Sequence, residues 1–157
     1  MRERSMEKDR ISKLSGALDA PVSQVRNSTV VTVKPEQIIE ACKLVIEDGE
    51  FYHLTTITGL DEGEAITLFY HFWRGKEFIN IKTSVPKSNA SLPSVTGVLP
   101  AAVLYEAEIS DLLGVTFVGN PLAGKRLLLP DNFPEGAPPP LRKESDPKQL
   151  RKMMDLE

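Results

Sequence analysis

Three carboxylates lie close together in one apolar stretch of the chain, and their types and spacing could support acid–base chemistry. Glu108 and Asp111 are three residues apart and share a face on a helix, whereas Glu106 lies away from Glu108. Such a pair can act as general acid and general base. Nothing nearby supplies a nucleophile, so pairing within an interface or within the chain is favoured over catalysis by an independent soluble enzyme. The available basic partners are Lys125, Arg126, Arg142 and Lys143.

A second stretch, residues 119–126, nearly matches the phosphate-binding pattern of nucleotide-binding proteins. It reads Gly-Asn-Pro-Leu-Ala-Gly-Lys-Arg, with both glycines and the lysine in place. A phosphate-binding loop needs a hydroxyl at the last position to hold magnesium, and it must open a helix. Arg126 supplies no hydroxyl, and Pro130 follows shortly after it. A nucleotide-binding module is therefore a disfavoured alternative.

Metal and redox sites have few candidate ligands. Cys42 is the only cysteine, so an intrachain disulfide, a four-cysteine zinc site and an iron–sulfur cluster held by this chain alone are excluded. His53 and His71 are expected on neighbouring strands, where they could face each other. No cysteine or clustered carboxylate completes a metal site with them, so structural or exposed roles are favoured. Aromatic residues beside His71 are expected in the core and on the face of a sheet; they are Phe69, Tyr70, Phe72 and Trp73.

Composition limits the class of protein. The chain has 157 residues, of which 41% are hydrophobic and 26% charged, and its formal net charge is −3. These values are typical of one globular domain with a tail. They show no excess of positive charge that would bind nucleic acid or an anionic membrane. No apolar run approaches the roughly 20 residues of a membrane helix. The charged first ten residues show no secretory signal pattern, so we expect a cytoplasmic location.

Local patterns predict an α+β fold, with a small antiparallel or mixed sheet and helices packed on one face. Apolar spacing from Ile38 to Ile46, after Pro35, predicts a helix that ends at Asp48-Gly49. Alternation of Ile66, Leu68, Tyr70 and Phe72 predicts a strand with one buried face. The other expected elements are a helix over residues 4–18, strands over 25–33, 51–60 and 79–85, and a helix from about Val98 that Gly114 stops.

The chain changes character near residue 118. We expect an α+β domain over residues 1–118 and an extended C-terminal docking tail over residues 119–157. Six prolines between Pro121 and Pro140 cannot belong to helix interiors or central strands. No regular element is expected in this tail, although it carries leucines. Such a segment is either disordered or laid on another protein.

The order of motifs along the second half of the chain is specific. Residues 105–117 read Tyr-Glu-Ala-Glu-Ile-Ser-Asp-Leu-Leu-Gly-Val-Thr-Phe. They are followed by a Gly-Asn-Pro turn, a basic pair at 125–126, an apolar run with Pro-Asp at 130–131 and a Pro-Leu-Arg-Lys segment at 140–143. With these motifs the chain resembles the 30 kDa (C) subunit family of respiratory complex I, including the related subunits of energy-converting membrane-bound hydrogenase-type complexes. That family has arginine where this chain has Ala107 and histidine where it has Asn120, which suits a divergent relative.

The resemblance implies a non-catalytic peripheral-arm subunit of a complex I-like, ion-pumping membrane oxidoreductase. This complex would be a ferredoxin-linked hydrogenase-type complex or, as the alternative, NADH:quinone oxidoreductase proper. It implies no cofactor in this chain, and iron–sulfur clusters, with or without nickel–iron, in partner subunits. The implied partners are a large hydrogenase-like (49 kDa-type) subunit and a cluster-bearing small subunit on the cytoplasmic side of the membrane, with no nucleic acid and no direct membrane contact. The implied interface or structural residues are Glu106, Glu108, Asp111, Arg126, Pro130, Asp131, Leu141, Arg142 and Lys143.

Overall fold

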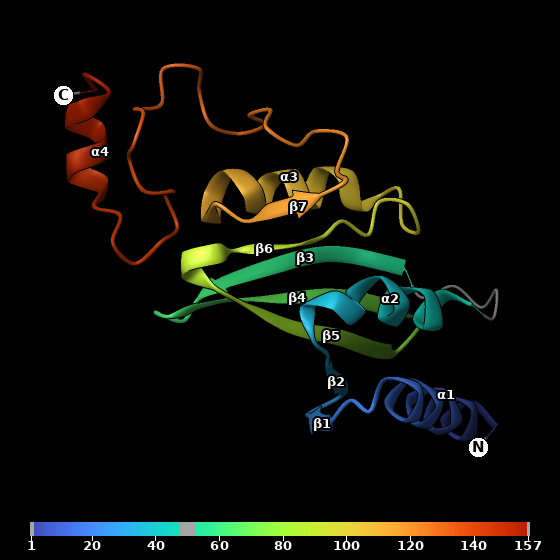
Figure 1. Cartoon of the computed structure of the whole chain (residues 1–157). Helices are drawn as coiled ribbons and strands as arrows, with labels where there is room; N and C mark the ends of the chain where they lie inside the picture. The colour runs from blue at the N-terminus through green and yellow to red at the C-terminus, as the bar shows by residue number, and fades with distance from the viewer. Residues whose placement is uncertain (1, 48–52, 157) are drawn as a thin grey trace.

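A computed structural model describes residues 2–47 and 53–156 of the chain (Figure 1). The expected end of the second helix at Asp48-Gly49 and the start of the next strand at Phe51 lie outside the described residues. The elements in chain order are α1 (Arg2–Leu18), β1 (Val22–Val25), β2 (Ser28–Thr32), the 3-10 turn η1 (Pro35–Gln37), α2 (Ile38–Ile46), β3 (His53–Asp61), β4 (Ala65–Arg74), β5 (Glu77–Pro86), the 3-10 turn η2 (Lys87–Asn89), β6 (Ser91–Pro93), α3 (Ala102–Leu113), β7 (Thr116–Val118) and α4 (Pro147–Met153).

The main sheet is mixed. Within the described residues its strand order is β1-β2-β5-β4-β3, and a separate pair is formed by β6 and β7. Strands β3, β4 and β5 form an antiparallel meander, whereas β2 lies parallel to β5, and the chain between β2 and β5 passes through α2, β3 and β4. The expected α+β class is confirmed.

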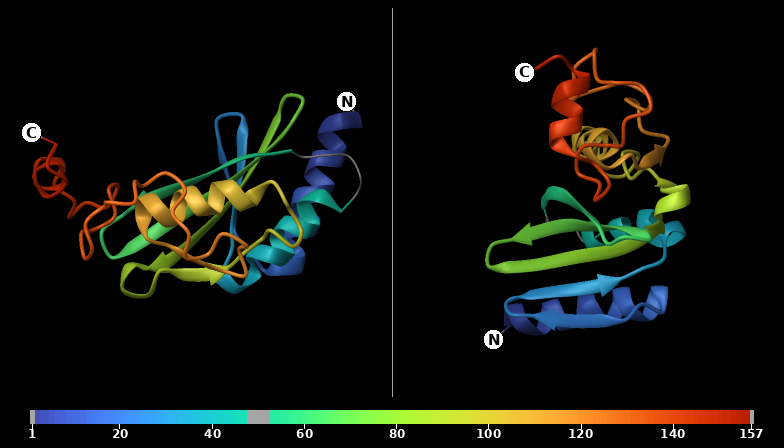
Figure 2. Two further views of the ribbon diagram at one scale, coloured as in Figure 1. Left: turned by 90° about the horizontal axis from the view of Figure 1, so that it is seen from above. Right: turned by 90° about the vertical axis from the view of Figure 1, so that its left-hand side faces the viewer.

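The alternation seen in β4 determines which face of the sheet is buried. Ile66, Leu68, Tyr70 and Phe72 are all fully buried, while Trp73 on the opposite face is 41% exposed. The apolar faces of α2 and α3 join these side chains in one core cluster. Figure 2 shows α3 running along the sheet, with the two chain termini at opposite ends of the molecule.

Three expectations about local structure are corrected. The strand expected over residues 25–33 is confirmed as β2 over Ser28–Thr32, but its first residues belong to a hairpin, in which β1 precedes β2 and Arg26 takes the turn with φ 56°. Helix α3 begins at Ala102 rather than near Val98, and residues 98–101 before it form irregular turns. In α1, Leu14 and Leu18 are buried as the spacing predicts, but Ala17 is exposed.

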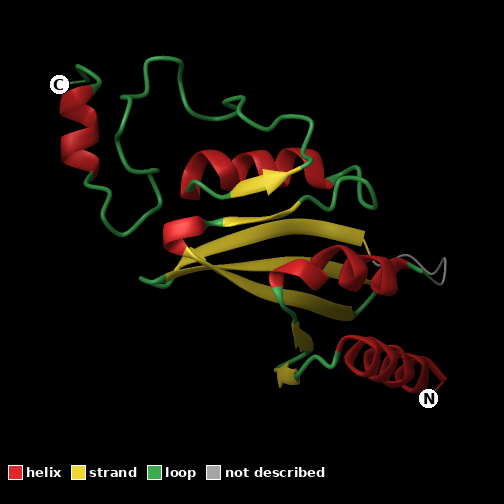
Figure 3. Ribbon diagram, viewed as in Figure 1, coloured by secondary structure: helices red, strands yellow, loops and turns green. Residues whose placement is uncertain are grey.

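The C-terminal tail, residues 119–157, is loop from Gly119 to Asp146 (Figure 3), and its last part is helical. The expectation of no regular element is therefore wrong for α4. Asp146 accepts a hydrogen bond from the amide of Lys148, and Pro147 occupies the first helical position, so two local signals start this helix. The last side chain of the core cluster is Phe117. A domain boundary at residues 118 and 119 stays a prediction.

The described residues contain no helix long and apolar enough to cross a membrane.

Close packing of α3 against β3 depends on Gly59. A Cβ atom at this position would lie 2.3 Å from Leu113 Cδ1 and 3.2 Å from Ile109 Cδ1. Because the core around α3 is packed, we expect Gly59→Val to lower the free energy of unfolding by about 1–3 kcal/mol. Chemical denaturation of the purified chain measures this. Gly97→Ala is the control, since nothing lies within 4 Å of a Cβ there; equal effects of the two substitutions would contradict the packing argument.

Candidate functional site

Glu106 joins three segments of the chain at the centre of α3. Its side chain is fully buried. Its carboxylate accepts hydrogen bonds from the Ser94 hydroxyl (2.6 Å), the Val95 amide (2.8 Å) and the Asn120 side-chain amide (2.8 Å). Asn120 also donates to the carbonyl of Val103. Buried carboxylates are costly without hydrogen bonds, so these neutral donors allow Glu106 to connect the end of β6 to the start of the tail.

Asp111, further along α3, holds the next part of the tail. One carboxylate oxygen accepts hydrogen bonds from three successive backbone amides, those of Leu127 (2.7 Å), Leu128 (2.7 Å) and Leu129 (3.1 Å). The side chains of Leu127 and Leu128 stay 40% and 54% exposed. The expected apolar run is thus fixed through its backbone, while two of its leucines remain accessible.

Arg126 closes the turn that follows. Its guanidinium donates to the carbonyls of Pro130 (2.9 Å), Asp131 (2.8 Å) and Phe133 (3.4 Å). Pro130 and Asp131 therefore act through their backbone carbonyls in this site. No helix follows residues 119–126 in the described chain before α4, so this segment lacks the geometry of a phosphate-binding loop.

The segment 140–144 is fixed to the C-terminal end of α3. The Arg142 guanidinium donates to the carbonyls of Leu113 (2.7 Å) and Gly114 (3.3 Å), and the amide of Leu141 donates to the carbonyl of Leu112 (2.9 Å). The last carbonyls of a helix lack partners within the helix, and they carry its negative dipole end. The cationic Arg142 side chain supplies hydrogen-bond donors to these carbonyls and positive charge at the negative end of the dipole. Gly114, with φ 65°, lets the chain turn at the end of α3.

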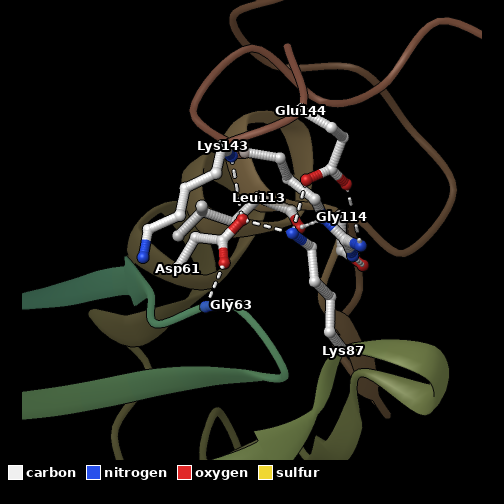
Figure 4. Close-up of polar contacts among 8 residues, drawn as sticks. Asp61, Gly63, Lys87, Leu113, Gly114, Lys143 and Glu144 are labelled. Carbon is white, nitrogen blue, oxygen red and sulfur yellow. Dashed lines mark hydrogen bonds and ion pairs between the residues drawn. The ribbon is translucent and has the colours of Figure 1, made fainter.

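An ion-paired clamp completes this attachment (Figure 4). Asp61, at the end of β3, accepts hydrogen bonds from the amide of Lys143 (2.9 Å), the amide of Gly63 (2.8 Å) and the Lys87 ammonium (2.6 Å). Lys87 also pairs with Glu144. We call Asp61, Lys87, Lys143 and Glu144 the tail clamp. The ammonium of Lys87 holds the pKa of Asp61 well below its ordinary value, while Asp61 and Glu144 raise the pKa of Lys87.

Asp61, Lys87 and Glu144 are not among the candidate residues that the sequence indicates. Asp61 lies 26 residues from Lys87 and 82 residues from Lys143. No local pattern connects positions so far apart, so only the folded chain reveals the tail clamp.

The cation partners expected for the α3 carboxylates are replaced by backbone and neutral donors. Glu106 and Asp111 bond to the groups described above, and Glu108 lies exposed on the surface of α3. Arg142 pairs instead with Glu144, at 3.9 Å. A carboxylate bonded mainly to fixed amides is suited to holding a loop in place rather than to moving protons.

The two histidines lie on strands β3 and β4, and the cysteine lies on α2. His53 lies opposite Trp73 and His71 opposite Thr56, so the two histidines do not face each other. His71 instead hydrogen-bonds Thr58 (2.8 Å) and Asn80 (2.7 Å). Within the described residues no group of three or more His, Cys, Asp or Glu side chains is arranged to hold a metal ion. Burial raises the pKa of the Cys42 thiol, which keeps it protonated.

A small cavity of about 180 Å³ lies beside α3. Its lining includes Ala107, Ser110, Thr116 and Leu122, together with Glu106 and Asn120, which are hydrogen-bonded to each other. Substrate pockets for small molecules are larger, at about 300–1,000 Å³.

Comparison with known proteins links this arrangement to one family. The profile described as "Respiratory-chain NADH dehydrogenase, 30 Kd subunit" matches residues 31–150. The C subunit of NADH-quinone oxidoreductase from Roseiflexus sp. (strain RS-1) is 32% identical over 129 residues, which cover 78% of this chain and 72% of that protein. The protein of the same name from Moorella thermoacetica is 32% identical over 130 residues, covering 80% and 85% of the two chains.

Solved structures agree with this assignment. A chain in the structure of the membrane-bound sulfane sulfur reductase, an archaeal respiratory membrane complex, superposes with a TM-score of 0.80 and 26% identity, covering 97% of this chain and 91% of that chain. The trypsin-resistant fragment of Nqo5 has a TM-score of 0.58 and 23% identity over 77% of this chain, which supports the fold alone.

The Asp111 contacts predict a specific defect. Asp111→Ala leaves three backbone amides without their acceptor, and we expect it to lower the free energy of unfolding by about 1–3 kcal/mol. It should also free the backbone after residue 125, so that trypsin cleaves after Lys125 and Arg126 at a lower protease concentration than in the unmodified chain. The matched control is Glu108→Ala, an exposed carboxylate on the same helix. Equal protease sensitivity in the two variants would show that Asp111 does not hold the tail.

The tail clamp predicts a pH dependence. The pKa of Asp61 is lower in the folded chain than its ordinary value of 3.8. The stabilisation that ionised Asp61 contributes is therefore complete above pH 3.8 and is lost as the pH falls through the pKa of the folded state. We therefore expect the hydrogen-exchange protection factor of the Lys143 amide to stay constant from pH 7 to about pH 4 and to decrease below that. Asp61→Asn should lower this protection and remove the dependence. The Thr116 amide, which donates to the carbonyl of Ala90, is the control; a parallel change there would indicate general unfolding instead.

Proposed function

Because the chain belongs to the respiratory-chain NADH dehydrogenase 30 Kd subunit family, we propose that it is a non-catalytic scaffold subunit in the peripheral arm of a complex I-like, ion-pumping membrane oxidoreductase. In this proposal the assembled complex carries out the oxidoreduction, and the chain itself has no active site. It acts by burying surface on the electron-transfer subunits and holding the arm together.

The observation that carries this proposal is the contrast between order and burial in the C-terminal tail. Among its described residues, 119–156, no apolar side chain belongs to the core cluster or packs against it. Yet Glu106, Asp111, Arg142 and the tail clamp hold the backbone of this segment at successive points. Exposed leucines on a fixed backbone bind a partner with little loss of chain entropy. Leu127, Leu128 and Leu141 are such side chains.

The proposed partners are a large hydrogenase-like (49 kDa-type) subunit and a cluster-bearing small subunit. They would hold the iron–sulfur clusters, with or without a nickel–iron site, so this chain needs no cofactor of its own. Its location would be the cytoplasmic side of the membrane, attached only through the complex. Glu108, Pro130, Asp131 and Lys143 are proposed to lie at or near the interface, because their side chains are exposed.

The branch of the family is a further part of the proposal. Similarity to a chain of the archaeal sulfane sulfur reductase complex extends over nearly the whole chain and supports a respiratory membrane complex other than NADH:quinone oxidoreductase proper, for which we propose the hydrogenase-type, ferredoxin-linked branch. The relatives that are named as the C subunit of NADH-quinone oxidoreductase support the alternative, a component of NADH:quinone oxidoreductase proper.

The experiment that tests the proposal is affinity purification of the tagged chain from its native membranes in mild detergent, followed by mass spectrometry. We expect a large hydrogenase-like subunit, a cluster-bearing small subunit and antiporter-like membrane proteins to be recovered with it. The presence or absence of metal-binding cysteines in the large subunit then separates the two branches. Recovery of the chain alone, or its stabilisation by nucleotides, would overturn the scaffold role.

The exposed leucines predict which variant disrupts assembly. Leu128→Asp places a charge on a side chain that is 54% exposed in the tail, and we expect it to reduce recovery of the large subunit at least about tenfold, as for a buried hot-spot residue. Val25→Asp is the matched control, because Val25 is 57% exposed and lies on β1, the edge strand of the sheet opposite to β3. Equal recovery with both variants would place the interface elsewhere.

A further inference from the structure

A buried carboxylate forms part of the wall of the cavity beside α3. The cavity measures about 180 Å³, and it lies between α3, β7 and the first loop of the tail. Figure 1 shows β7 lying along α3, with the tail leaving from the end of β7. The lining residues are Glu106, Ala107 and Ser110 of α3, Thr116 and Phe117 of β7, and Asn120, Leu122, Ala123 and Gly124 of the tail. These walls all belong to this chain.

The carboxylate of Glu106 is held by neutral groups. Its side chain is fully buried, and its three hydrogen bonds come from a hydroxyl, a backbone amide and a carboxamide. Among the described residues no ion pair includes Glu106, and no Lys, Arg or His of that part of the chain lines the cavity. A carboxylate offers about four acceptor positions, so one position remains for a further donor. Buried charges in proteins are ordinarily paired, and this cavity gives a cation access to Glu106.

The other lining residues select a small organic cation. Ser110 and Thr116 bring hydroxyl groups, whereas Phe117 and Leu122 bring apolar side chains. Divalent cations such as Ca²⁺ take about six to eight oxygen ligands with carboxylates among them, and Glu106 is the one carboxylate of the described lining. An ammonium group on a short alkyl chain instead matches a carboxylate and hydroxyls at one end and apolar side chains at the other. The small volume of the cavity excludes larger ligands.

The tail side of the cavity is shaped by tight turns. The amide of Leu122 donates to the side-chain oxygen of Asn120 (2.7 Å), and the amide of Ala123 donates to the carbonyl of Asn120 (3.0 Å). The amide of Lys125 donates to the carbonyl of Leu122 (2.9 Å). Because Asn120 also bonds to Glu106, these turns are tied to α3. A ligand that contacts both α3 and this loop in the folded chain would strengthen the tie.

We propose that this cavity binds a small organic cation, a primary ammonium group on a short alkyl chain, whose charge pairs with Glu106. The hydroxyls of Ser110 and Thr116 accept hydrogen bonds from the ammonium, and Phe117 and Leu122 contact the alkyl chain. The bound cation links α3 to the first loop of the tail and stabilises that attachment. This inference is independent of the proposed scaffold function, because the site is built from this chain alone.

Titration of the full-length chain with n-propylammonium chloride, followed by amide NMR spectroscopy, tests the proposal. We expect saturable shifts of the amides of Ala107, Ser110 and Leu122 with a Kd of about 1–10 mM, because so small a ligand makes few contacts. Three compounds serve as controls. n-Propanol has the alkyl chain without the charge, propionate has the opposite charge, and potassium chloride gives the same ionic strength. Each should bind at least about tenfold more weakly, since it cannot pair its charge and its alkyl chain with the site at once.

Two variants alter the site in different ways. Glu106→Gln removes the charge, whereas Ala107→Leu fills the cavity and keeps the carboxylate. Each should raise the Kd for n-propylammonium at least about tenfold. Ala101→Leu is the matched control, because Ala101 is exposed just before α3 and outside the cavity, and it should leave the Kd unchanged. The amide spectrum without ligand shows whether each variant is folded, and Ala107→Leu decides the test if Glu106→Gln unfolds.

Hydrogen exchange measures the effect on the tail. At ten times the Kd of n-propylammonium, exchange of the Ala123 amide should slow by up to about elevenfold, because the ligand must leave before the loop opens. The Val33 amide, which donates to the carbonyl of Lys82 in the sheet region, is the control and should change less. Three results would each overturn the inference: no saturable shift, equal binding of n-propanol or potassium chloride, or undiminished binding by Ala107→Leu.

Discussion

The structure depends on the need to satisfy buried carboxylates on α3. Glu106 is fully buried and Asp111 nearly so, and a carboxylate removed from water is stable only when its oxygens accept hydrogen bonds. Both residues meet this need with groups from other segments, mainly backbone amides. Helix α3 therefore determines the positions of the end of β6 and of the first part of the tail, besides covering the sheet.

This arrangement explains how a proline-rich tail is ordered without a core of its own. Apolar burial orders the domain as far as Phe117. Beyond that residue, the attachments are polar and directional: Asp111 holds the backbone of residues 127–129, Arg142 holds the end of α3, and Asp61 holds the amide of Lys143. Because hydrogen bonds fix the backbone while Leu127, Leu128 and Leu141 remain exposed, the same contacts that stabilise the tail also leave these leucines accessible. A segment that is preordered in this way loses less entropy when it binds.

Local patterns predicted those elements whose stability is expressed within a few residues. The alternation in β4 predicted the correct buried face, and the spacing from Ile38 to Ile46 predicted α2. Gly114 ends α3 in the left-handed conformation, as a glycine after a helical run indicates. The hairpin of β1 and β2 was missed because Arg26, rather than a glycine or asparagine, takes the positive φ in its turn. Helix α4 was missed because its cap, Asp146-Pro147, precedes only two turns of helix.

The sequence by itself determined the fold class, the family and the candidate charged residues on α3 and at positions 126, 142 and 143, because these depend on residue type and on spacing within a motif. Only the tertiary structure decided what each charge binds. Asp111 and Arg126 are of opposite sign, yet each bonds to backbone groups instead of to the other. Asp61 reaches Lys143 across 82 residues. Charge sign indicates that a side chain needs a partner, but the path of the folded backbone determines which donor or acceptor comes within hydrogen-bond distance.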